Sequence, residues 1–431
     1  MLKGLLQQLQ AQPFPRRSNW CRASNWCRAV QTMSACQLPA EGKLSDPRAE
    51  GPRCETILIE VGGSSGEELA SLLEPAVELL KRGEVVAFPT ETVYGLGANA
   101  LSDAAVAKIF QAKGRPSDNP LIVHISSLDM LPLLTPFSAD SQDPRAALVL
   151  SLTRRFWPGP LTLLFPKSAA VSSLVTCGVS TVAVRMPSHP VALALISQAA
   201  LPLAAPSANV SGRPSPTSAE HVWADLHGLV PCVVSAGPSA VGLESTVVDV
   251  WRSPPLVLRP GGVTLEQLRL VDPSFELFQA AAADLHAPAT PGLKYRHYSP
   301  DTAVTLLIFP DPDSSASDAS LSIAAKKVMS HVELQLASLP ADASVAVVRT
   351  QSRIVYPQSF LVHPRIHFRQ LFRDDSPNES LDVAAGMFAT LRELEKVPGL
   401  SRIFFECVPE KDEGVAVMNR IRKASSSILQ L

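Results

Sequence analysis

The hydrophobic positions of the chain first show a clear period between Glu67 and Lys81, where leucines and alanines recur at helical spacing. Gly83 follows as a stop signal, so we predict a helix over this stretch. A short apolar run at 85–88 then predicts a buried strand that ends at Pro89. This change from a helical period to a short apolar run favours an α/β organisation.

The same alternation continues along the chain. A loop at 90–97 follows the first strand, and Asp103 is placed to cap a helix that ends near Ala112. Further strands are predicted at 121–125, 161–165, 181–185, 203–205, 233–235, 245–250 and 256–259, and further helices at about 145–156, 190–199 and 217–226. Short strands interleaved with helices predict an α/β domain with a twisted, mixed sheet over residues 57–272.

Residues 302–431 restart the pattern on a smaller scale. Apolar runs predict strands at 304–309, 344–348 and 402–407, and helical spacing predicts helices at 381–396 and 419–425. We therefore predict a second, Rossmann-like or flavodoxin-like domain. The linker between the two domains, 273–301, contains two Tyr, one His and two cations within KYRHY, unlike a plain Gly/Ser tether, so we expect it to fold over something.

Composition narrows the classes of function. The 431 residues suffice for two or three domains, and the net charge of −2 gives no general reason for nucleic-acid binding. No run of about 18 apolar residues lacks a charge or Pro, so no membrane span is expected. The seven cysteines form no CxxC pair, which favours reduced thiols over disulfides or a zinc site.

The segment 1–53 differs from the rest of the chain, because five cations precede its first acid, Glu41. An acid-poor, Arg- and Ser-containing start is typical of an organelle transit peptide, and a disordered tail is the alternative. A transit peptide would place the protein in a mitochondrion or plastid, and a tail would leave it cytoplasmic. The repeat SNWCRA at 18–29 has no mechanism that we can name.

Several polar clusters lie at predicted element ends. No GxxxxGK[ST] loop and no GxGxxG after a strand is present, so any nucleotide must meet another phosphate cradle. The loop 113–120 supplies Lys113, Arg115 and Asn119, while Arg185 and Arg259 each end an apolar strand. Small and hydroxyl residues at 204–217 would let backbone amides approach a phosphate. Together these clusters favour a concave polyanion pocket.

Each cluster also has a plainer interpretation. The loop 113–120 could be a basic surface loop, and Arg185 could form an internal salt bridge. The segment 204–217 could be a polar loop that caps a helix at Ser215 or Thr217. His124, alone in an apolar strand, is by itself more often a core histidine than a catalytic one.

Seven blocks carry a family resemblance in order along the chain. They are FPTETVYGLGANA (88–100), KGRPSDNPLIVHI (113–125), FWPGPLTLL (156–164), VAVRMPSHP (182–190), APSANVSGRPSPT (205–217), STVVDV (245–250) and LRPGG (258–262). They resemble the YrdC-like domain. The linker PGLKYRHYSP (291–300) and the domain after it resemble the long, two-domain form of threonylcarbamoyl-adenylate synthase, so the likeness covers about 57–431.

This resemblance implies a twisted α/β sheet with a basic cavity and a defined reaction. The family converts L-threonine, bicarbonate or CO2, and ATP into threonylcarbamoyl-adenylate and pyrophosphate, with Mg²⁺ accompanying ATP. Partner enzymes then transfer the threonylcarbamoyl group to an adenosine beside the tRNA anticodon. Weak RNA binding and no membrane contact are the further expectations.

The resemblance also implies residue roles. Lys113 and Arg115 form the family's K-x-R pair, which we assign to catalysis. The positions expected to hold L-threonine are Thr92, His124, Arg185, Ala205 and Ser245; those expected to contact ATP are Arg115, Asn119, Thr181, Ser207, Asn209, Ser215, Arg259 and Tyr295; and His297 and Tyr298 belong to a linker expected to cover the site as a lid.

Two other classes of function compete with this one. An RNA-binding YrdC-like protein without synthase activity would need a broad basic surface and stacking aromatics, whereas aromatics make up only 6% here. A carbamoyltransferase that uses a YrdC-like module would need an acylphosphatase-like and a zinc-finger region, and the lack of paired CxxC motifs argues against it.

Overall fold

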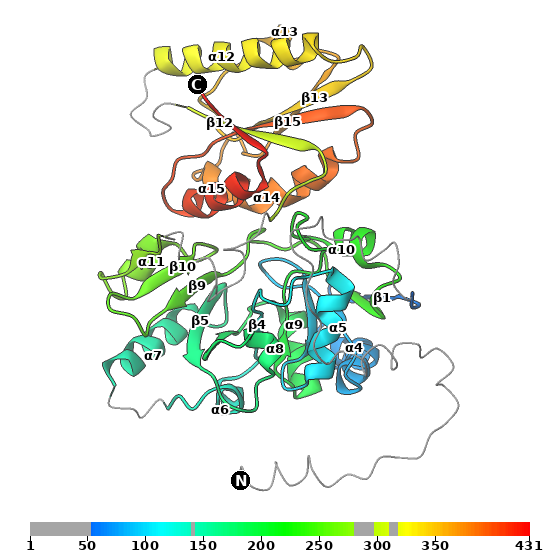
Figure 1. The fold of residues 1–431 in the computed structure, drawn as a ribbon, viewed down its shortest axis with the longest axis vertical. Coiled ribbons are helices and arrows are strands. Elements are labelled where there is room, and N and C mark those ends of the chain that lie inside the picture. The colour runs from blue at the N-terminus through cyan, green and yellow to red at the C-terminus, as the bar shows by residue number, and fades with distance from the viewer. Residues whose placement is uncertain (1–52, 139–142, 280–296, 310–317) are drawn as a thin grey trace, which may run out of the picture. The chain divides into compact units, whose positions relative to one another are not determined.

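A computed structural model describes residues 53–138, 143–279, 297–309 and 318–431, and residues 44–431 form one compact unit. Two sheets organise this unit, one of eleven strands and one of five (Figure 1). Within the described ranges, no helix is long and apolar enough to cross a membrane. The α/β class predicted from the sequence, with a large mixed sheet and a smaller second sheet, is confirmed.

The larger sheet has the strand order β1-β8-β2-β3-β7-β4-β6-β5-β9-β10-β11, with parallel and antiparallel neighbours. Its strands are β1 (Ile57–Glu60), β2 (Val86–Phe88), β3 (Gly95–Asn99), β4 (Ile122–His124), β5 (Leu161–Pro166), β6 (Thr181–Arg185), β7 (Leu203–Ala204), β8 (Cys232–Ser235), β9 (Thr246–Asp249), β10 (Leu256–Arg259) and β11 (Glu276–Leu277). Six of the ten neighbouring pairs in this sheet join strands that are not consecutive in the chain, so residues far apart in the sequence meet on it.

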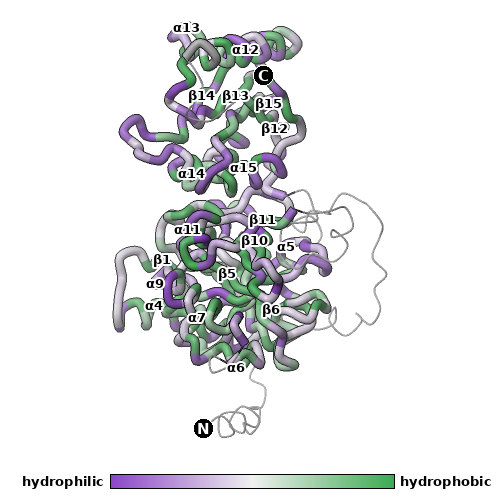
Figure 2. The backbone as a smooth tube through the Cα atoms, turned by 90° about the vertical axis from the view of Figure 1, so that its left-hand side faces the viewer, coloured by the Kyte–Doolittle hydropathy of each residue, from purple (hydrophilic) through white to green (hydrophobic). Residues whose placement is uncertain are grey.

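Helices cover both faces of the β1–β8–β2 end of this sheet. The alternation within β2 shows why: Val86 and Phe88 pack with α4 (Gly66–Lys81) and α9 (Pro190–Ala199), whereas Ala87 points into the core on the opposite face. The other helices of this domain are α5 (Asp103–Lys113), α6 (Leu131–Leu134), α7 (Pro144–Phe156), α8 (Ser173–Thr176), α10 (Ala219–Leu226), α11 (Leu265–Arg269) and the 3-10 turn η1 (Leu128–Met130). Figure 2 shows the hydrophobic residues concentrated along these buried strands.

The other half of the sheet leaves part of one face to polar residues. On β4, Val123 points into the main core, while Ile122 and His124 point to the opposite face. The strand register pairs His124 with Arg185 of β6, and Arg185 with Thr162 of β5. Three polar side chains therefore lie in one row across three adjacent strands.

The smaller sheet is entirely parallel, in the order β14-β13-β15-β12-β16. Its strands are β12 (Ala303–Ile308), β13 (Ser344–Arg349), β14 (Ile366–Gln370), β15 (Leu400–Glu406) and β16 (Ser427–Gln430). Helices α12 (Asp318–Ala337) and α13 (Gln358–Leu361) cover one face, and α14 (Glu379–Leu394) and α15 (Glu413–Ala424) cover the other (Figure 1). Helices on both faces bury both sides of this parallel sheet, which explains why its central strands are continuous apolar runs.

The structure corrects two local predictions. The loop predicted at 90–97 ends early, because Gly95–Asn99 forms β3. A Cβ at Gly97 would lie 2.6 Å from the Phe88 ring, so this position requires glycine. Because the strand contains glycine in place of a larger apolar residue, its sequence lacks the pattern that usually predicts a strand. The helix cap is Ser102, whose hydroxyl accepts a hydrogen bond from Ala105 N, and Asp103 is the first helical residue.

Candidate active site

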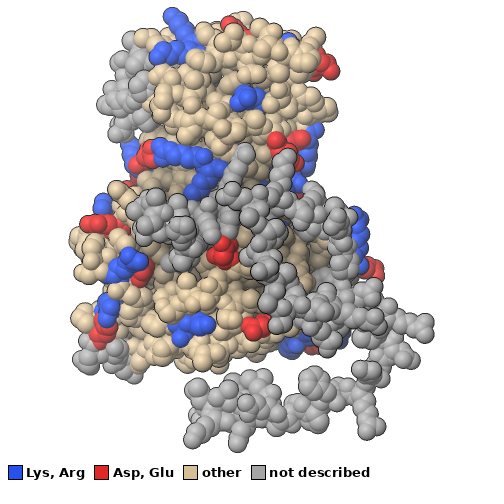
Figure 3. All heavy atoms as spheres, in the orientation of Figure 1, with Lys and Arg blue, Asp and Glu red and all other residues tan. Residues whose placement is uncertain are grey.

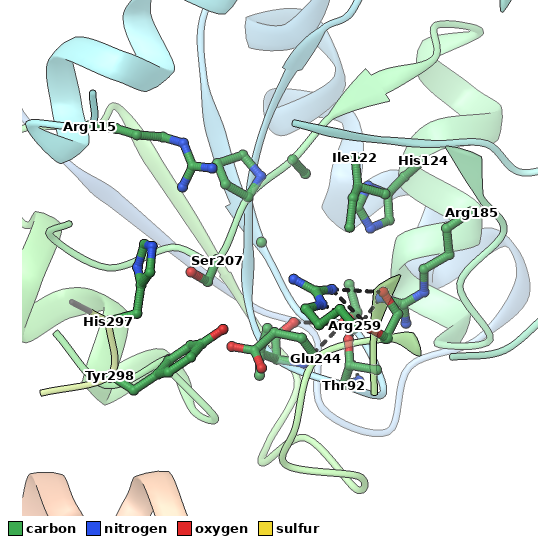
Figure 4. A pocket seen from close by; sticks show the side chains of 16 residues that line it. Thr92, Arg115, Ile122, His124, Arg185, Ser207, Glu244, Arg259, His297 and Tyr298 are labelled. Atoms are coloured by element: carbon green, nitrogen blue, oxygen red, sulfur yellow. Dashed lines mark hydrogen bonds between the residues drawn. The ribbon is translucent and has the colours of Figure 1, made fainter. Parts of the chain in front are cut away.

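A cavity opens over the polar face of the larger sheet (Figure 4). Its walls come from segments scattered over two hundred positions of the chain. The lining residues are Thr90, Thr92, Val93, Gly95, Arg115, Ile122, His124, Arg185, Ala205, Pro206, Ser207, Glu244, Ser245, Arg259, His297 and Tyr298. Ten residues that the family resemblance singled out therefore line one cavity. They are Thr92, Arg115, His124, Arg185, Ala205, Ser207, Ser245 and Arg259, together with His297 and Tyr298 from the linker.

Arg185 is held in the cavity wall by three partners. Its Nη1 donates to Thr92 Oγ1 at 2.8 Å, and its Nε donates to Gly159 O at 3.2 Å. Its Nη2 lies 2.6 Å from Glu91 Oε1 in an ion pair. Burial alone would raise the pKa of Glu91, but the charge and the hydrogen bond of Arg185, together with backbone hydrogen bonds, outweigh burial and lower it. Arg185 therefore both forms an internal salt bridge and lines the cavity, so the two interpretations of this residue are compatible.

His124 lies beside Arg185 on the same face of the sheet (Figure 4). Burial, followed by the Arg185 charge, lowers the pKa of His124 to about 3, so the imidazole is neutral at physiological pH. Its Nδ1 is buried and finds no hydrogen-bond partner among the described residues. A buried polar atom without a partner, in a cavity wall, indicates a ligand-contacting position.

Arg259 and Ser245 form a second polar group on the cavity wall. Arg259 Nε and Nη2 donate to Ser245 O at 3.2 and 2.9 Å, which fixes the guanidinium against the start of β9. The Ser245 hydroxyl lies 2.8 Å from Thr162 Oγ1. Burial lowers the pKa of Arg259, but a guanidinium remains protonated at neutral pH. This wall therefore presents a fixed positive charge.

Arg115 enters the cavity from the loop after α5 (Figure 4). Its Nε donates to Asn119 O at 3.2 Å and its Nη2 to Pro120 O at 3.1 Å. Burial lowers the pKa of Arg115 to about 10, which still leaves it charged. Both polar atoms of the Asn119 side chain are buried without partners in the described structure, although Asn119 is outside the residues that line the cavity.

Lys113 is buried away from the cavity, in contrast to Arg115. Its ammonium donates to the carbonyls of Ser207 and Asn209, so it braces the loop that carries Ser207 to the cavity wall. Burial, and then the charge of Arg115, lowers the pKa of Lys113 well below its usual value. A direct catalytic contact by Lys113 stays a prediction, and its observed contacts are those of a positioning residue.

Three further predicted ATP contacts support the cavity without lining it. Thr181 is the half-buried first residue of β6. The Asn209 amide donates to Val210 O and Arg213 O. Ser215 donates to Glu244 Oε1 at 2.6 Å, and Glu244 does line the cavity. Their roles toward a ligand stay predictions.

The chain re-enters the described structure at the cavity wall. His297 and Tyr298 both line it, whereas Tyr295 lies outside the described residues. Tyr298 has a φ of 64°, in the left-handed region that non-glycine residues rarely adopt. Its ring packs on Phe388 of α14, with ring centroids 5.3 Å apart. Packing holds Tyr298 in this conformation, as is common at functional sites.

Glu91 and Glu244 are acidic residues of the site to which sequence reasoning gave no role. Their carboxylates each pair with a buried arginine, Arg185 and Arg420 respectively. A buried carboxylate needs a cationic partner, so the acidic Glu91 next to the predicted threonine contact Thr92 could have indicated an ion pair at this site. Arg420 is 176 positions from Glu244, so no local pattern could have paired them.

Gly261 keeps two cavity segments in close contact. A Cβ there would lie 2.3 Å from Glu244 O and 2.5 Å from Thr246 N. Gly261→Ala should therefore force β9 away from the end of β10 and destabilise the fold by about 1–3 kcal/mol, measured as a lower thermal midpoint. Gly62→Ala is the matched control, because a Cβ at Gly62 meets nothing within 4 Å. An equal midpoint for both variants would contradict this packing.

The cavity is better suited to ligand-borne than to protein-bound metal. Among the described residues, no group of three or more His, Cys, Asp or Glu could hold a metal ion. The two acidic residues at the site, Glu91 and Glu244, are both engaged by arginines. These residues fit Mg²⁺ only as an ion that arrives on phosphates.

Comparisons with known proteins agree in covering both domains. Residues 78–261 match the family described as Telomere recombination, and residues 263–426 match the family described as Threonylcarbamoyl-AMP synthase, C-terminal domain. The chain is 40% identical over 351 residues to the threonylcarbamoyl-AMP synthase of Pyrococcus abyssi, across 81% of this chain and 93% of that one. It is 41% identical over 386 residues to the enzyme of the same name from Schizosaccharomyces pombe, across 84% and 90%.

A solved structure extends this likeness to three dimensions. The crystal structure of Pyrococcus abyssi Sua5 complexed with L-threonine superposes with a TM-score of 0.73 at 38% identity. The match covers 87% of this chain and 99% of that one. The two-domain arrangement of elements is therefore shared over nearly the whole length of that protein.

Proposed function

Because the chain belongs to the threonylcarbamoyl-AMP synthase family, we propose that its cavity joins L-threonine, CO2 or bicarbonate, and ATP into threonylcarbamoyl-AMP and pyrophosphate. The observation that carries the proposal is the presence of three guanidinium groups, Arg115, Arg185 and Arg259, in the lining of one cavity, with Arg185 and Arg259 buried. Three fixed cations in one pocket suit a carboxylate and a triphosphate better than any neutral substrate.

The threonine half of the reaction is assigned to the Arg185 end of the cavity. Arg185 would bind the substrate carboxylate, with Thr92 and neutral His124 as polar neighbours. The amine nitrogen then forms a bond to the carbon of CO2 and loses a proton, which yields a carbamate. A neutral imidazole beside this nitrogen adds no positive charge that would repel the ammonium form of threonine on entry.

The ATP half is assigned to Arg115, Ser207 and Arg259. The carbamate oxygen attacks the α-phosphorus, and the bond from this phosphorus to the pyrophosphate oxygen breaks. No covalent enzyme intermediate is needed, so fixed donors and positioning supply the catalysis. Asn119, whose buried amide has no partner among the described residues, would contact the nucleotide. Mg²⁺, carried by ATP, would neutralise phosphate charge.

His297 and Tyr298 would keep water from the carbamate and the adenylate, both of which hydrolyse. We keep the wider proposal that the linker 273–301 is a lid for this site. Threonylcarbamoyl-transfer enzymes acting on a tRNA adenosine would consume the product. Weak binding of RNA by this protein would be consistent with passing the product to enzymes that act on tRNA.

The product itself tests the proposal. The purified protein, given ATP, Mg²⁺, L-threonine and ¹³C-labelled bicarbonate, should form an adenylate that carries both threonine and the heavy carbon, detected by mass spectrometry. An unlabelled threonyl-adenylate would mean that the carbamoyl step is absent. Salt-dependent RNA binding without any adenylate would favour the RNA-binding alternative. On the face drawn in Figure 3, cations and anions of the described residues are interspersed, which gives that alternative no basic band.

The compartment is a separate proposal that rests on residues 1–53. A fusion of residues 1–53 to a fluorescent protein should enter mitochondria or plastids, since five cations of this segment precede its first acid. The control replaces Arg16, Arg17, Arg22 and Arg28 with Gln. A diffuse cytoplasmic signal from the unsubstituted fusion would contradict the transit peptide.

A further inference from the structure

The second domain places a buried cation against Glu244, a residue of the cavity wall. Arg420 lies on α15 and is 0% exposed, and its Nε is 3.0 Å from Glu244 Oε2. Glu244 is a cavity residue whose other oxygen accepts the hydrogen bond from Ser215. A single carboxylate thus joins the second domain to a predicted ATP contact.

Arg420 also binds the other segment that forms this wall. Its Nη1 donates to Pro260 O, immediately after Arg259. Gly261, the next residue, packs against the backbone of Glu244. One guanidinium therefore holds the segment of Glu244 and the segment of Arg259 in a fixed relation.

The lid residue Tyr298 is the third contact of Arg420. The guanidinium carbon lies 5.9 Å from the centroid of the Tyr298 ring, in cation–π geometry. Burial would raise the pKa of Glu244, but the charges of Arg420 and then Arg259, together with hydrogen bonds from Ser215 and the backbone, outweigh burial and lower it. The carboxylate is ionised, and Arg420 is its principal partner.

Simple adhesion between the domains does not explain why Arg420 lies here. The same interface holds Arg392 of α14, which donates to Asp225 Oδ2 at 2.8 Å and to Pro214 O. Arg392 and Arg420 share residue type, burial and partner types, a carboxylate and a proline carbonyl. They differ in what they contact: Glu244 and Tyr298, the neighbours of Arg420, line the cavity, whereas Asp225 and Pro214, the partners of Arg392, do not.

We propose that Arg420 is a positioning residue through which the second domain sets the geometry of the nucleotide half of the site. It orients Glu244 and, through Glu244, Ser215, and its hydrogen bond to Pro260 O fixes the backbone beside Arg259. The inference rests on the proposed function in one respect, the identity of the nucleotide as ATP. It gives the second domain a task in the reaction that its own fold does not reveal.

Arg420→Met and Arg392→Met make a matched pair of variants. Arg420→Met should raise the KM for ATP by at least about tenfold, with the KM for L-threonine changed by less than about threefold. Arg392→Met should lower the thermal midpoint similarly but leave the KM for ATP within about threefold of the unsubstituted protein. Equal effects of both variants on the KM for ATP would overturn the proposal.

Two further variants keep the test decisive. Arg420→Met leaves Glu244 without its partner, so the double variant Arg420→Met/Glu244→Gln removes the unpaired charge if the single variant fails to fold. Arg420→Lys keeps the charge but loses the planar fork, and it should restore part of the ATP affinity. An Arg420→Lys enzyme with unchanged kinetics alongside a double variant with unchanged kinetics would contradict a positioning role.

Direct binding of MgATP separates this inference from the proposed function. Calorimetric titration should show MgATP bound at least about tenfold more weakly by Arg420→Met than by Arg392→Met. If the unsubstituted protein released no threonine-dependent pyrophosphate, the proposed function would fall while this comparison still decided the role of Arg420. Equal MgATP affinities would overturn that role even in an active enzyme.

Discussion

Arg185→Ala should raise the KM for L-threonine by about two to three orders of magnitude, while the KM for ATP changes by less than about threefold. The reason is that the Arg185 fork is the cavity's candidate partner for the substrate carboxylate, next to Thr92 and His124. Charge-assisted bonds in a buried site are worth several times those in water, so their loss is large. Initial rates of pyrophosphate release at varied threonine and at varied ATP measure both constants.

The Arg185→Ala variant also leaves Glu91 as a buried charge without its ion-pair partner. Breaking such a pair costs about 3–5 kcal/mol, which could unfold the protein and mimic a catalytic defect. The double variant Arg185→Ala/Glu91→Gln removes that charge and should recover the thermal midpoint without recovering threonine use. Equal losses of threonine and ATP use in the double variant would mean that the role assigned to Arg185 is wrong.

Arg115→Ala should show the opposite selectivity. We expect the KM for ATP to rise at least about 30-fold and the KM for threonine to stay within about threefold, because Arg115 is assigned to the phosphates. Its guanidinium is charged despite burial and reaches the cavity from the loop after α5. The same kinetic measurements apply.

Arg145→Ala is the control for Arg115→Ala. Arg145 pairs with Asp143 at the surface and lies outside the cavity lining. Its replacement should leave both KM values unchanged, since exposed ion pairs contribute about 0–1 kcal/mol. A threonine defect in Arg115→Ala as large as its ATP defect would place Arg115 in the wrong half of the site.

The sequence predicted the strands of the site more closely than its loops. Arg185 ends β6 where the apolar run ends, and the register then places it beside His124. Lys113 was predicted to accompany Arg115, but Gly114 adopts a left-handed φ of 59° after α5 and turns the two side chains apart. A glycine in the sequence can indicate that a helix ends there. It does not indicate in which directions the side chains before and after it point.

Four elements of the second domain, α12, α13, β14 and β16, escaped prediction, and the physical reason is plain for two of them. Strand β14, IHFRQ, lies at a sheet edge and is only partly buried, so its polar residues hide its period. Helix α12 exposes Ile323 and Leu334, which blurs its apolar face. Arg420 was invisible for a different reason: its function depends on Glu244, a partner in another domain.

The most direct test of the central claim is pyrophosphate release from ATP-Mg by the purified protein. We expect release that requires both L-threonine and bicarbonate, with one adenylate formed for each pyrophosphate. Release that is independent of threonine, or no release from a folded protein supplied with all three substrates, would contradict it.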